Sequence, residues 1–590
     1  MKKWLAVVLI LSLHVVVGAV DQPDARFLSI SLNYQLRPDG SWLFDCQQRV
    51  RLDTYAAVNR LGETFIVTNP DFQTLTVLKA ETTMADGTKV AVPANALNEV
   101  LPFPAHLFAD FSRMREMVVT HTGLERGAVI ELHYQVLTRP GFMPYFTGRE
   151  PLTRIFPIDR YTLRIEWPDQ YRLQFKVFNL ELTPKRQQSP GRSALEFSQT
   201  DVPPLLPEPG SRESDQPFVL FSSAIGWPEA FAFLDGDSAL PQALKEKARQ
   251  FKERQPQTAD FLRGLQKMIA DEIQTCPLDL NVTGLRLRGN ERIFASAYAT
   301  AVEKTRLLAR LLAAMDVPTH ILAVLENDPL GAVPSALAAG SFLIKVKDGN
   351  EFLYLDPFNA QAEFFPYKKE GAMTFNLDSR QIEPLPADDW DRNRVAVSGT
   401  VRLSAEKTTG NLTVTASGYF QNYPAARENQ QAFLTGLLAK FFPVKELAVK
   451  KIEIIGPTSI RAEIEFSGGW LQPFGEKALG LHPVKWPQPP ADALALEQRR
   501  LPLHIDAPYR LSLRLRLELP AEWAIDYIGR DVVVENGVGH FRRSWQPEAG
   551  EWRAELGIRS PAVAPDRYPE LKNLLQPWLV PDYWLVLVRK

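Results

Sequence analysis

The alternation of apolar and polar side chains constrains this chain most strongly. It has the period of half-buried β-strands in two long stretches, one before residue 182 and one after residue 390. In the clearest case, residues 509–519, every second residue is apolar. Between the two stretches the apolar residues recur with the period of a helix. This pattern predicts β-rich domains on both sides of an α+β domain.

The first stretch, residues 20–182, is expected to form an N-terminal β-sandwich. Asp-Gly pairs at 39–40 and 86–87 are turn signals between strands that we predict at 29–36, 74–80 and 127–136. Residues 183–239 contain prolines at 203, 204, 207 and 209, which cannot donate a backbone hydrogen bond. We therefore expect 183–239 to be an extended, proline-rich connector.

Residues 240–385 are expected to form the α+β domain. Helices are predicted over 262–273 and 307–315, and Pro277 should end the first of them at about Cys276. Strands are predicted at 320–325, 342–347 and 352–355. Residues 390–590 are expected to be β-rich, with strands at 395–404, 412–417 and 509–519 and helices around 428–442 and 568–578.

The N-terminus carries a targeting pattern. Met1-Lys2-Lys3 is followed by an apolar run over 4–17 and by the small residues Gly18 and Ala19. This pattern is typical of a secretory signal peptide over 1–19. The alternative is an uncleaved anchor, but the run is shorter than the roughly 20 residues that a membrane span needs. We expect an extracytoplasmic protein, periplasmic or secreted, with no transmembrane segment after cleavage.

Charge and cysteine content limit the classes of partner. The formal net charge is -2 and no long basic stripe occurs, so nothing indicates a nucleic-acid partner. Only two cysteines occur, Cys46 and Cys276, in different predicted domains. We favour two free or buried thiols over a single bridge between them. Without zinc-ligand spacing, a phosphate-binding glycine loop or a dinucleotide motif, we expect no metal site and no cofactor.

One run of residues carries the functional interpretation. Residues 298–320 read Tyr-Ala-Thr-Ala-Val-Glu-Lys-Thr-Arg-Leu-Leu-Ala-Arg-Leu-Leu-Ala-Ala-Met-Asp-Val-Pro-Thr-His. This run resembles the core of bacterial transglutaminase-like domains, in which Tyr-Gly-Asp-Cys-Lys-Asp-Lys-Ala precedes two leucine pairs and a Gly-Ile-Pro-Ala segment. Tyr298, Lys304, both leucine pairs and Pro318 match without a gap. Ala301 stands at the position of the family's catalytic Cys, and Glu303 at that of an Asp.

Hairpin spacing suggests the other two catalytic positions. The turn signal Asp348-Gly349 predicts pairing between residues whose numbers sum to 697, which puts Ser341 opposite Asp356. The resemblance then assigns Ser341 to the family's His and Asp356 to its Asp. In the family a thiolate at a helix N-terminus attacks, the His takes the proton and the Asp orients the His. The resemblance therefore implies a degenerate triad of Ala301, Ser341 and Asp356, with no catalytic residue.

Two other residues are candidates to replace the missing nucleophile and base. Cys276 is predicted at the C-terminal end of a helix, where the helix dipole disfavours a thiolate, so a buried structural thiol is the favoured interpretation. His320 lies near the start of a predicted strand and is interpreted as a structural or surface residue.

Three functional hypotheses follow. Most of the mature chain is similar to exported bacterial proteins with an uncharacterised N-terminal β-domain, a transglutaminase-like core and a β-rich C-terminal region. The favoured hypothesis is a non-catalytic binding or scaffold protein of the cell envelope, with a protein, peptide or glycan ligand, because nucleophile and base are missing together. The alternative is a thiol-independent hydrolase or amidase that acts on peptides in the same cleft through Asp356, Ser341 and Thr300. The third is a purely structural array of domains.

Overall fold

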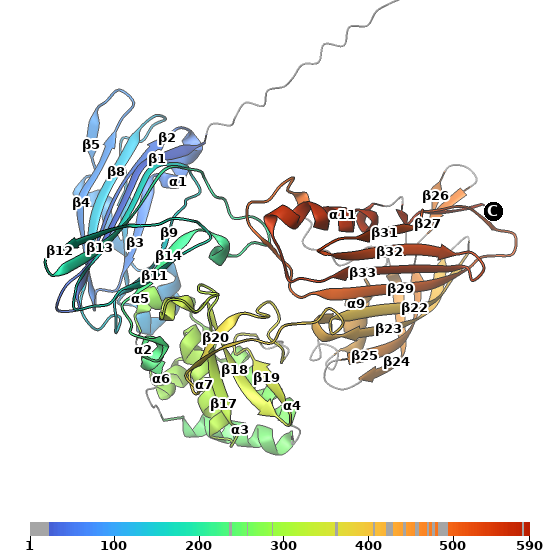
Figure 1. Cartoon of the computed structure of the whole chain (residues 1–590). Coiled ribbons are helices and arrows are strands. Elements are labelled where there is room, and N and C mark those ends of the chain that lie inside the picture. The colour runs from blue at the N-terminus through green and yellow to red at the C-terminus, as the bar shows by residue number, and fades with distance from the viewer. Residues whose placement is uncertain are drawn as a thin grey trace, which may run out of the picture.

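The chain divides into three parts in space (Figure 1). The computed structural model describes residues 23–589, apart from 235–238, 256–257, 286, 360–363, 405–406, 421–428, 440–443, 455–458, 469–470, 475–477, 482–493 and 581–582. The predicted signal peptide over 1–19 lies outside the described residues. Among those described, no helix is both long and apolar enough to cross a membrane.

The N-terminal part is built on one eight-stranded sheet. Its predicted strands and the turn at Asp39-Gly40 are confirmed, and Gly40 has the positive φ of 82° that such a turn favours. All neighbouring strands are antiparallel except β1 and β10, which are parallel. The strand order is β12 (Lys185–Ser189), β13 (Arg192–Val202), β10 (Ile158–Pro168), β1 (Ala25–Leu36), β2 (Trp42–Leu52), β8 (Val129–Thr138), β4 (Gln73–Thr83) and β5 (Lys89–Ala91).

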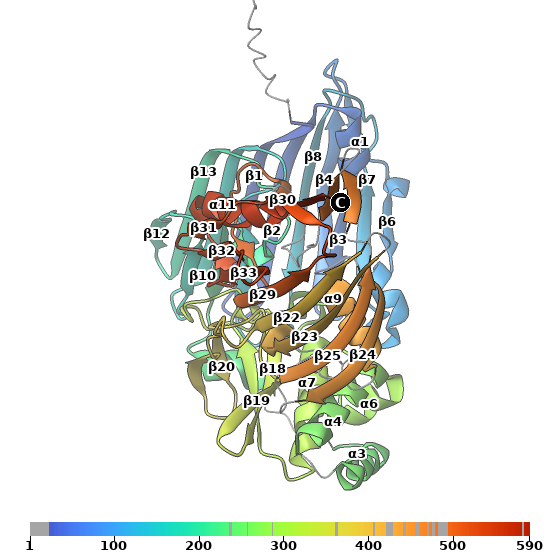
Figure 2. The ribbon, with the colours of Figure 1, turned by 90° about the vertical axis from the view of Figure 1, so that its right-hand side faces the viewer.

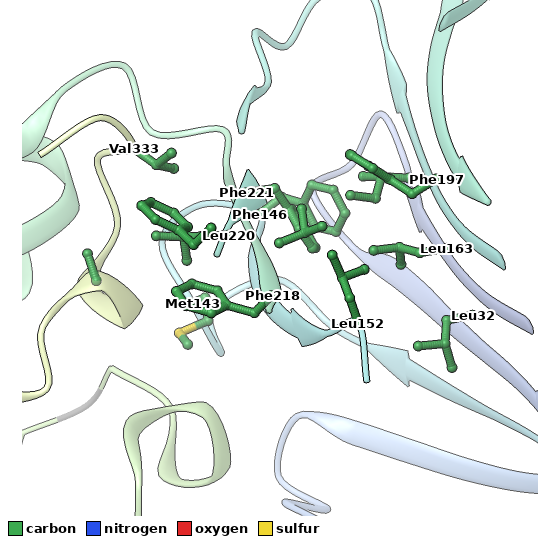
Figure 3. Packing of buried hydrophobic residues seen from close by; sticks show 14 of the residues in the cluster. Leu32, Met143, Phe146, Leu152, Leu163, Phe197, Phe218, Leu220, Phe221 and Val333 are labelled. Atoms are coloured by element: carbon green, nitrogen blue, oxygen red, sulfur yellow. The ribbon is translucent and has the colours of Figure 1, made fainter. Parts of the chain in front are cut away.

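A second layer covers one face of this sheet, as expected of a sandwich, but it is divided into two small sheets. Phe221 of the first small sheet points towards Leu163 and Phe197 of the large one (Figure 3). The second packs through Ile66 and Val119 against β4 and β8. The two orders are β11 (Gln174–Phe178), β14 (Phe218–Ser222), β9 (Thr147–Pro151), and β3 (Glu63–Thr68), β7 (Arg115–Thr120), β6 (Leu97–Val100).

The expected connector over 183–239 is the main correction to the domain prediction. Residues 185–202 form β12 and β13 of the large sheet, and 218–222 form β14. Leu195 and Phe197 alternate into the core from β13, so this segment completes the N-terminal sheet rather than linking it to the next domain. Between β13 and β14, residues 203–217 form no strand, and this stretch contains the four prolines at 203, 204, 207 and 209.

The central part places helices before a small antiparallel sheet. The main helices are α3 (Gln242–Arg254), α4 (Thr258–Glu272) and α7 (Ala301–Ala313), with the short α2 (Trp227–Phe231), α5 (Leu280–Thr283) and α6 (Asn290–Ser296). The sheet order is β19 (Glu351–Leu355), β18 (Ser341–Asp348), β17 (Thr319–Val324), β20 (Met373–Asn376) and β21 (Gln381–Pro384).

Helix α4 ends at Glu272, four residues before the expected end at Cys276. The helix stops there because the next residues form strand β15 (Gln274–Thr275), which pairs with β16 (Tyr298–Ala299). Cys46 and Cys276 are both free and buried, which confirms the interpretation as two separate thiols.

The C-terminal part is β-rich, as predicted, with helices α9 (Gln430–Ala439) and α11 (Tyr568–Leu579). Seen from its own side, its large sheet lies in front of the other two parts (Figure 2). That sheet has the order β24 (Val444–Ile454), β25 (Ser459–Gly468), β23 (Thr408–Ser417), β22 (Arg394–Leu403), β29 (Tyr509–Glu518), β33 (Glu551–Ile558), β32 (Gly539–Gln546), β31 (Val532–Glu535). A four-stranded sheet comprises β26 (Leu471–Phe474), β27 (Ala478–Leu481), β35 (Val586–Arg589) and β30 (Ala524–Ile528), and a short pair is formed by β28 (Leu503–His504) and β34 (Ala562–Val563).

The N-terminal and central parts share one hydrophobic core. Buried residues of β14, together with Phe146 and Leu152 on either side of β9, belong to the same hydrophobic cluster as Val333, Ala336, Phe342 and Phe375 of the central part. Figure 3 shows Val333 beside Leu220. The C-terminal part has its own separate core. The first two parts are therefore held together by apolar burial, and the third is joined to them by surface contacts.

Candidate functional site

A cavity of about 1080 Å³ lies where the three parts meet. Its volume is at the upper end of the range for ligand sites, which is roughly 300–1,000 Å³. The N-terminal part contributes aromatic side chains, the central part contributes the start of α7 and the loops after β17 and before β18, and the C-terminal part contributes His504, Ile505 and Asp506. Every part of the chain thus forms some of its wall.

Ala301 lies at this cavity wall, as the first residue of α7. The helix begins here because Thr300 and Glu303 form a capping box: the Thr300 side chain accepts from the Glu303 N–H, and the Glu303 carboxylate accepts from the Thr300 N–H at 3.0 Å. Thr300 and Val302 line the cavity as well. At the position where the resemblance places a nucleophile, the cavity meets a methyl group.

The predicted pairing of Ser341 with Asp356 is wrong. Asp348 pairs with Glu351, so paired numbers sum to 699, and Ser341 pairs instead with Val324 of β17. Gly349, with φ 59°, occupies the first central position of the turn. A two-residue turn of this kind favours glycine at its first central position. The central residues are therefore 349 and 350, one residue further along the chain than the predicted Asp348-Gly349.

The partner of Ser341 is Glu326. The Ser341 Oγ donates to Glu326 Oε1 at 2.7 Å, and Glu326 lines the cavity just after β17. A Cβ on Gly340 would lie 2.4 Å from Glu326 Oε2, so a glycine is needed there to leave room for the carboxylate. Glu326 was not predicted as a site residue from the sequence. Its signal was a carboxylate directly after a predicted strand, and that signal is weak on its own.

Asp356 is not among the residues that line the cavity. Its N–H donates to Gln266 Oε1 at 3.0 Å, and its carboxylate accepts from the Phe358 N–H at 3.0 Å. It acts electrostatically on Lys304, which is 1% exposed and donates to the Ala270 carbonyl at 3.1 Å. Burial lowers the pKa of Lys304 to about 8. Asp356 thus stabilises the packing behind α7.

The two other residues weighed as replacements lie apart from the site. Burial raises the pKa of the Cys276 thiol to about 11, which leaves it protonated at neutral pH. The Nδ1 atom of His320, on β17, lies 3.8 Å from Asp378 Oδ2 in a half-exposed pair. Neither residue is among those that line the cavity.

The opposite wall of the cavity is strand β9. The Tyr34 hydroxyl donates to Glu150, and burial raises the pKa values of both groups, so the carboxyl is driven towards its neutral form. Arg149 stacks over Phe218, with its guanidinium carbon 4.3 Å from the ring centroid, and donates to Glu213 at 2.7 Å. Both residues of β9 line the cavity.

An ionic network ties the start of α7 to the N-terminal part. The Arg288 guanidinium donates to Asp110 at 2.6 Å, to Glu303 at 2.7 Å and to the Tyr298 carbonyl at 2.9 Å. Arg292 also binds Asp110, and together with Arg288 it lowers the pKa of that carboxyl to about 2. The position of Ala301 at the cavity therefore depends on residues from two parts of the chain.

Comparisons with known proteins fit this division into parts. Residues 38–205 match a family model described as a domain of unknown function with solved-structure structure (DUF3857). No curated protein matches. A solved structure from Parabacteroides distasonis, described as a putative protease, is similar over 96% of this chain and 99% of its own, with a TM-score of 0.71 and 20% identity.

Two further solved structures share little of the overall arrangement. One is a putative cysteine protease from Cytophaga hutchinsonii, with 7% identity, a TM-score of 0.16 and coverage of 37% of this chain and 79% of its own. The other is the periplasmic domain of TgpA from Pseudomonas aeruginosa, with 12% identity, a TM-score of 0.17 and coverage of 48% and 88%. The Parabacteroides structure alone among these three has the fold of the whole chain.

Proposed function

We propose that this chain is an exported, non-catalytic protein of the transglutaminase-like architecture, which binds a protein, peptide or glycan ligand of the cell envelope in its three-part cavity. The observation that carries the proposal is Ala301. It lines the cavity at the first turn of α7, where the family's thiolate would stand, and its methyl group cannot attack a carbonyl.

The surroundings of Ala301 support the same conclusion. The cavity-lining Glu326 accepts a hydrogen bond from the Ser341 hydroxyl, and this pair contains no imidazole. Of the described residues that line the cavity, the one histidine is His504, and its Nε2 is 3.0 Å from each carboxylate oxygen of Asp215. A large cavity with aromatic walls remains suited to binding even though a nucleophile and its base are missing.

Thiol-independent hydrolysis is the second candidate function. The observation in its favour is the Ser341–Glu326 hydrogen bond, since a carboxylate at a cavity wall is able to hold a water or accept a proton from a hydroxyl. The similar Parabacteroides structure is described as a putative protease, but at 20% identity the likeness concerns the fold alone.

Activity assays on the mature protein, residues 20–590, separate the two functions. Incorporation of dansylcadaverine into dimethylcasein and hydrolysis of fluorescein-casein are measured side by side. We expect neither above the buffer rate, because no activated nucleophile faces the cavity. Activity that is lost in Glu326→Gln or Asp356→Ala, but kept in the exposed control Glu465→Gln, would establish the hydrolase and overturn the non-catalytic proposal.

Export is part of the proposal and rests on the pattern of residues 1–19. Fractionation of cells that express the full chain tests it. Release with the periplasm or medium, together with an N-terminus at Val20 by mass spectrometry, is the expected result. Retention in the cytoplasm with Met1 intact would contradict it.

A further inference from the structure

The second layer of the N-terminal part has a gap between its two small sheets. Both small sheets pack on the same face of the eight-stranded sheet. The first belongs to the cluster that contains Cys46, and the second packs near Tyr134. Cys46 and Tyr134 lie directly opposite each other on β2 and β8, so their side chains point to the same face. Strand β9 is the edge of one small sheet and β3 the edge of the other. Residues 65–67 of β3 and 147–150 of β9 line the same cavity, which therefore runs between two open strand edges.

The backbone of β3 offers hydrogen-bonding groups to this gap. The His121 N–H donates to the Gly62 carbonyl at 2.9 Å, and bonded pairs recur at every second residue of an antiparallel ladder. Thr64, Ile66 and Thr68 therefore point their N–H and C=O groups towards β7. Those of Phe65 and Val67 point the opposite way, along the open edge.

Residues 65–67 of this edge lack the usual protection, and the charge on β3 is confined to the exposed Glu63 at its start. Phe65 is 57% exposed and Val67 is 39% exposed, and the run Phe65-Ile66-Val67 contains no charge and no proline. Unpaired apolar edges are templates for strand addition, and proteins normally cover, charge or interrupt them. The other edge strand of the same sheet, β6, carries the exposed Glu99. The uncharged segment 65–67 of β3 is the part of this strand that lines the cavity.

The rest of the gap suits an extended peptide. Tyr34, Phe44 and Tyr134 form an aromatic floor that belongs to the large sheet. Ladder bonds at Phe146 and Leu152 leave the backbone groups of Thr147 and Arg149 pointing away from β14. The buried Arg149 Nε has no hydrogen-bond partner among the described residues.

We propose that an extended segment of another protein binds in this gap as an added strand, hydrogen-bonded to the open edge of β3, with alternate apolar side chains on the aromatic floor. The inference rests on the proposed binding function and narrows its ligand from protein, peptide or glycan to peptide. Strand addition selects peptides because only a peptide repeats N–H and C=O groups at the spacing of the edge. β9 forms the opposite wall.

Fluorescence anisotropy with two synthetic probes tests the backbone requirement. The first is a fluorescein-labelled hexapeptide amide of alternating Thr and Val, and the second has the same sequence with every backbone amide nitrogen methylated, which blocks both edges of the strand. We expect saturable binding of the first and binding weaker by about tenfold for the second, the loss that about one backbone hydrogen bond accounts for. Equal affinity of the two probes would overturn strand addition.

A matched pair of proline variants locates the edge. Val67→Pro removes one N–H from the open edge of β3 and leaves the β7 ladder intact. Glu99→Pro makes the same change on β6, where the register with β7 also points the N–H of residue 99 outwards. Thermal melts check that both variants fold. We expect Val67→Pro to weaken binding of the unmethylated probe by about tenfold and Glu99→Pro to leave it unchanged.

Three other outcomes are decisive. If light scattering shows a dimer that Val67→Pro dissolves, the edge pairs with a second copy of this chain and the proposal is wrong. If the unmethylated probe does not bind at all, the peptide proposal fails while the non-catalytic function stands. If the probe binds and mass spectrometry shows it cleaved, strand addition stands and the non-catalytic function fails.

Discussion

At the scale of single residues, the side chain at position 301 decides what chemistry this cavity supports. The capping box at Thr300 and Glu303 builds a helix start that lowers the pKa of a thiol placed there. In the family that residues 298–320 resemble, a cysteine stands at this helix start, and here the residue is Ala301. The proposed non-catalytic role rests on this difference.

Ala301→Cys tests that placement directly. We expect the new thiol to react with iodoacetamide in the native protein, because position 301 lines the cavity and lies at a helix N-terminus. Intact-mass spectrometry after a short labelling pulse should show one added carbamidomethyl group. Amine incorporation should remain absent, since no imidazole adjoins this position.

The unmodified protein is the control for that experiment. Cys46 and Cys276 are 5% and 2% exposed, and burial raises the pKa of each thiol to about 11. Neither should be labelled under native conditions. Labelling of the parent chain, or a variant thiol that reacts only after denaturation, would show that position 301 does not face the cavity.

At the scale of elements, the start of α7 depends on Arg288. This guanidinium neutralises Glu303, which is 1% exposed, and bridges it to Asp110 of the N-terminal part. Arg288→Met leaves the Glu303 carboxylate buried with its ion-pair partner removed. We expect a loss of about 3–5 kcal/mol in the free energy of unfolding, measured by urea denaturation at pH 7.

Arg292→Met is the matched control, since Arg292 binds the same Asp110 but has a side chain that is 58% exposed. We expect it to cost less than about 1 kcal/mol, as surface pairs do. Equal losses in the two variants would mean that the ion pair with Glu303 is not what holds the helix start.

At the scale of the whole molecule, the proline-rich residues 203–212 hold the C-terminal part in place. Glu208 accepts from the N–H groups of Arg500 and Leu501 at 2.9 and 3.1 Å, and the Gly210 carbonyl accepts from the His504 N–H at 2.9 Å. These contacts bring His504 and Asp506 to the cavity. Closure of the cavity therefore depends on polar contacts rather than on a shared core.

Glu208→Ala should loosen this junction. We expect faster amide hydrogen exchange at residues 499–506, because two backbone donors lose their acceptor, with no change in β17 or β18. Glu518→Ala, which removes an exposed pair with Arg402 at 2.9 Å, serves as the control. Unchanged exchange at 499–506 would show that other contacts hold the C-terminal part.

The elements of this protein follow from its sequence because their signals are local. Strands β1, β8 and β29 were predicted within four residues, since a period of 2 is visible in short windows. Helix α7 was also predicted, but it begins six residues before the expected start at 307. The alanine at position 301, where the resemblance leads us to expect a nucleophile, is also identified from the sequence alone. These features need no knowledge of which segments meet.

What only the tertiary structure decided is which distant segments pair. Residues 185–202 were predicted to belong to a connector, because no pattern within the segment itself indicates that β13 pairs with β10. The hairpin register differs from the prediction because Gly349 occupies the first central position of the turn. The hydrogen-bond partner of Ser341 is Glu326, 15 residues away in the sequence. The cavity exists only once the three parts of the chain are packed together. The open edge of β3 also depends on the tertiary structure, because a backbone group can be called unpaired only when the neighbouring strands are known.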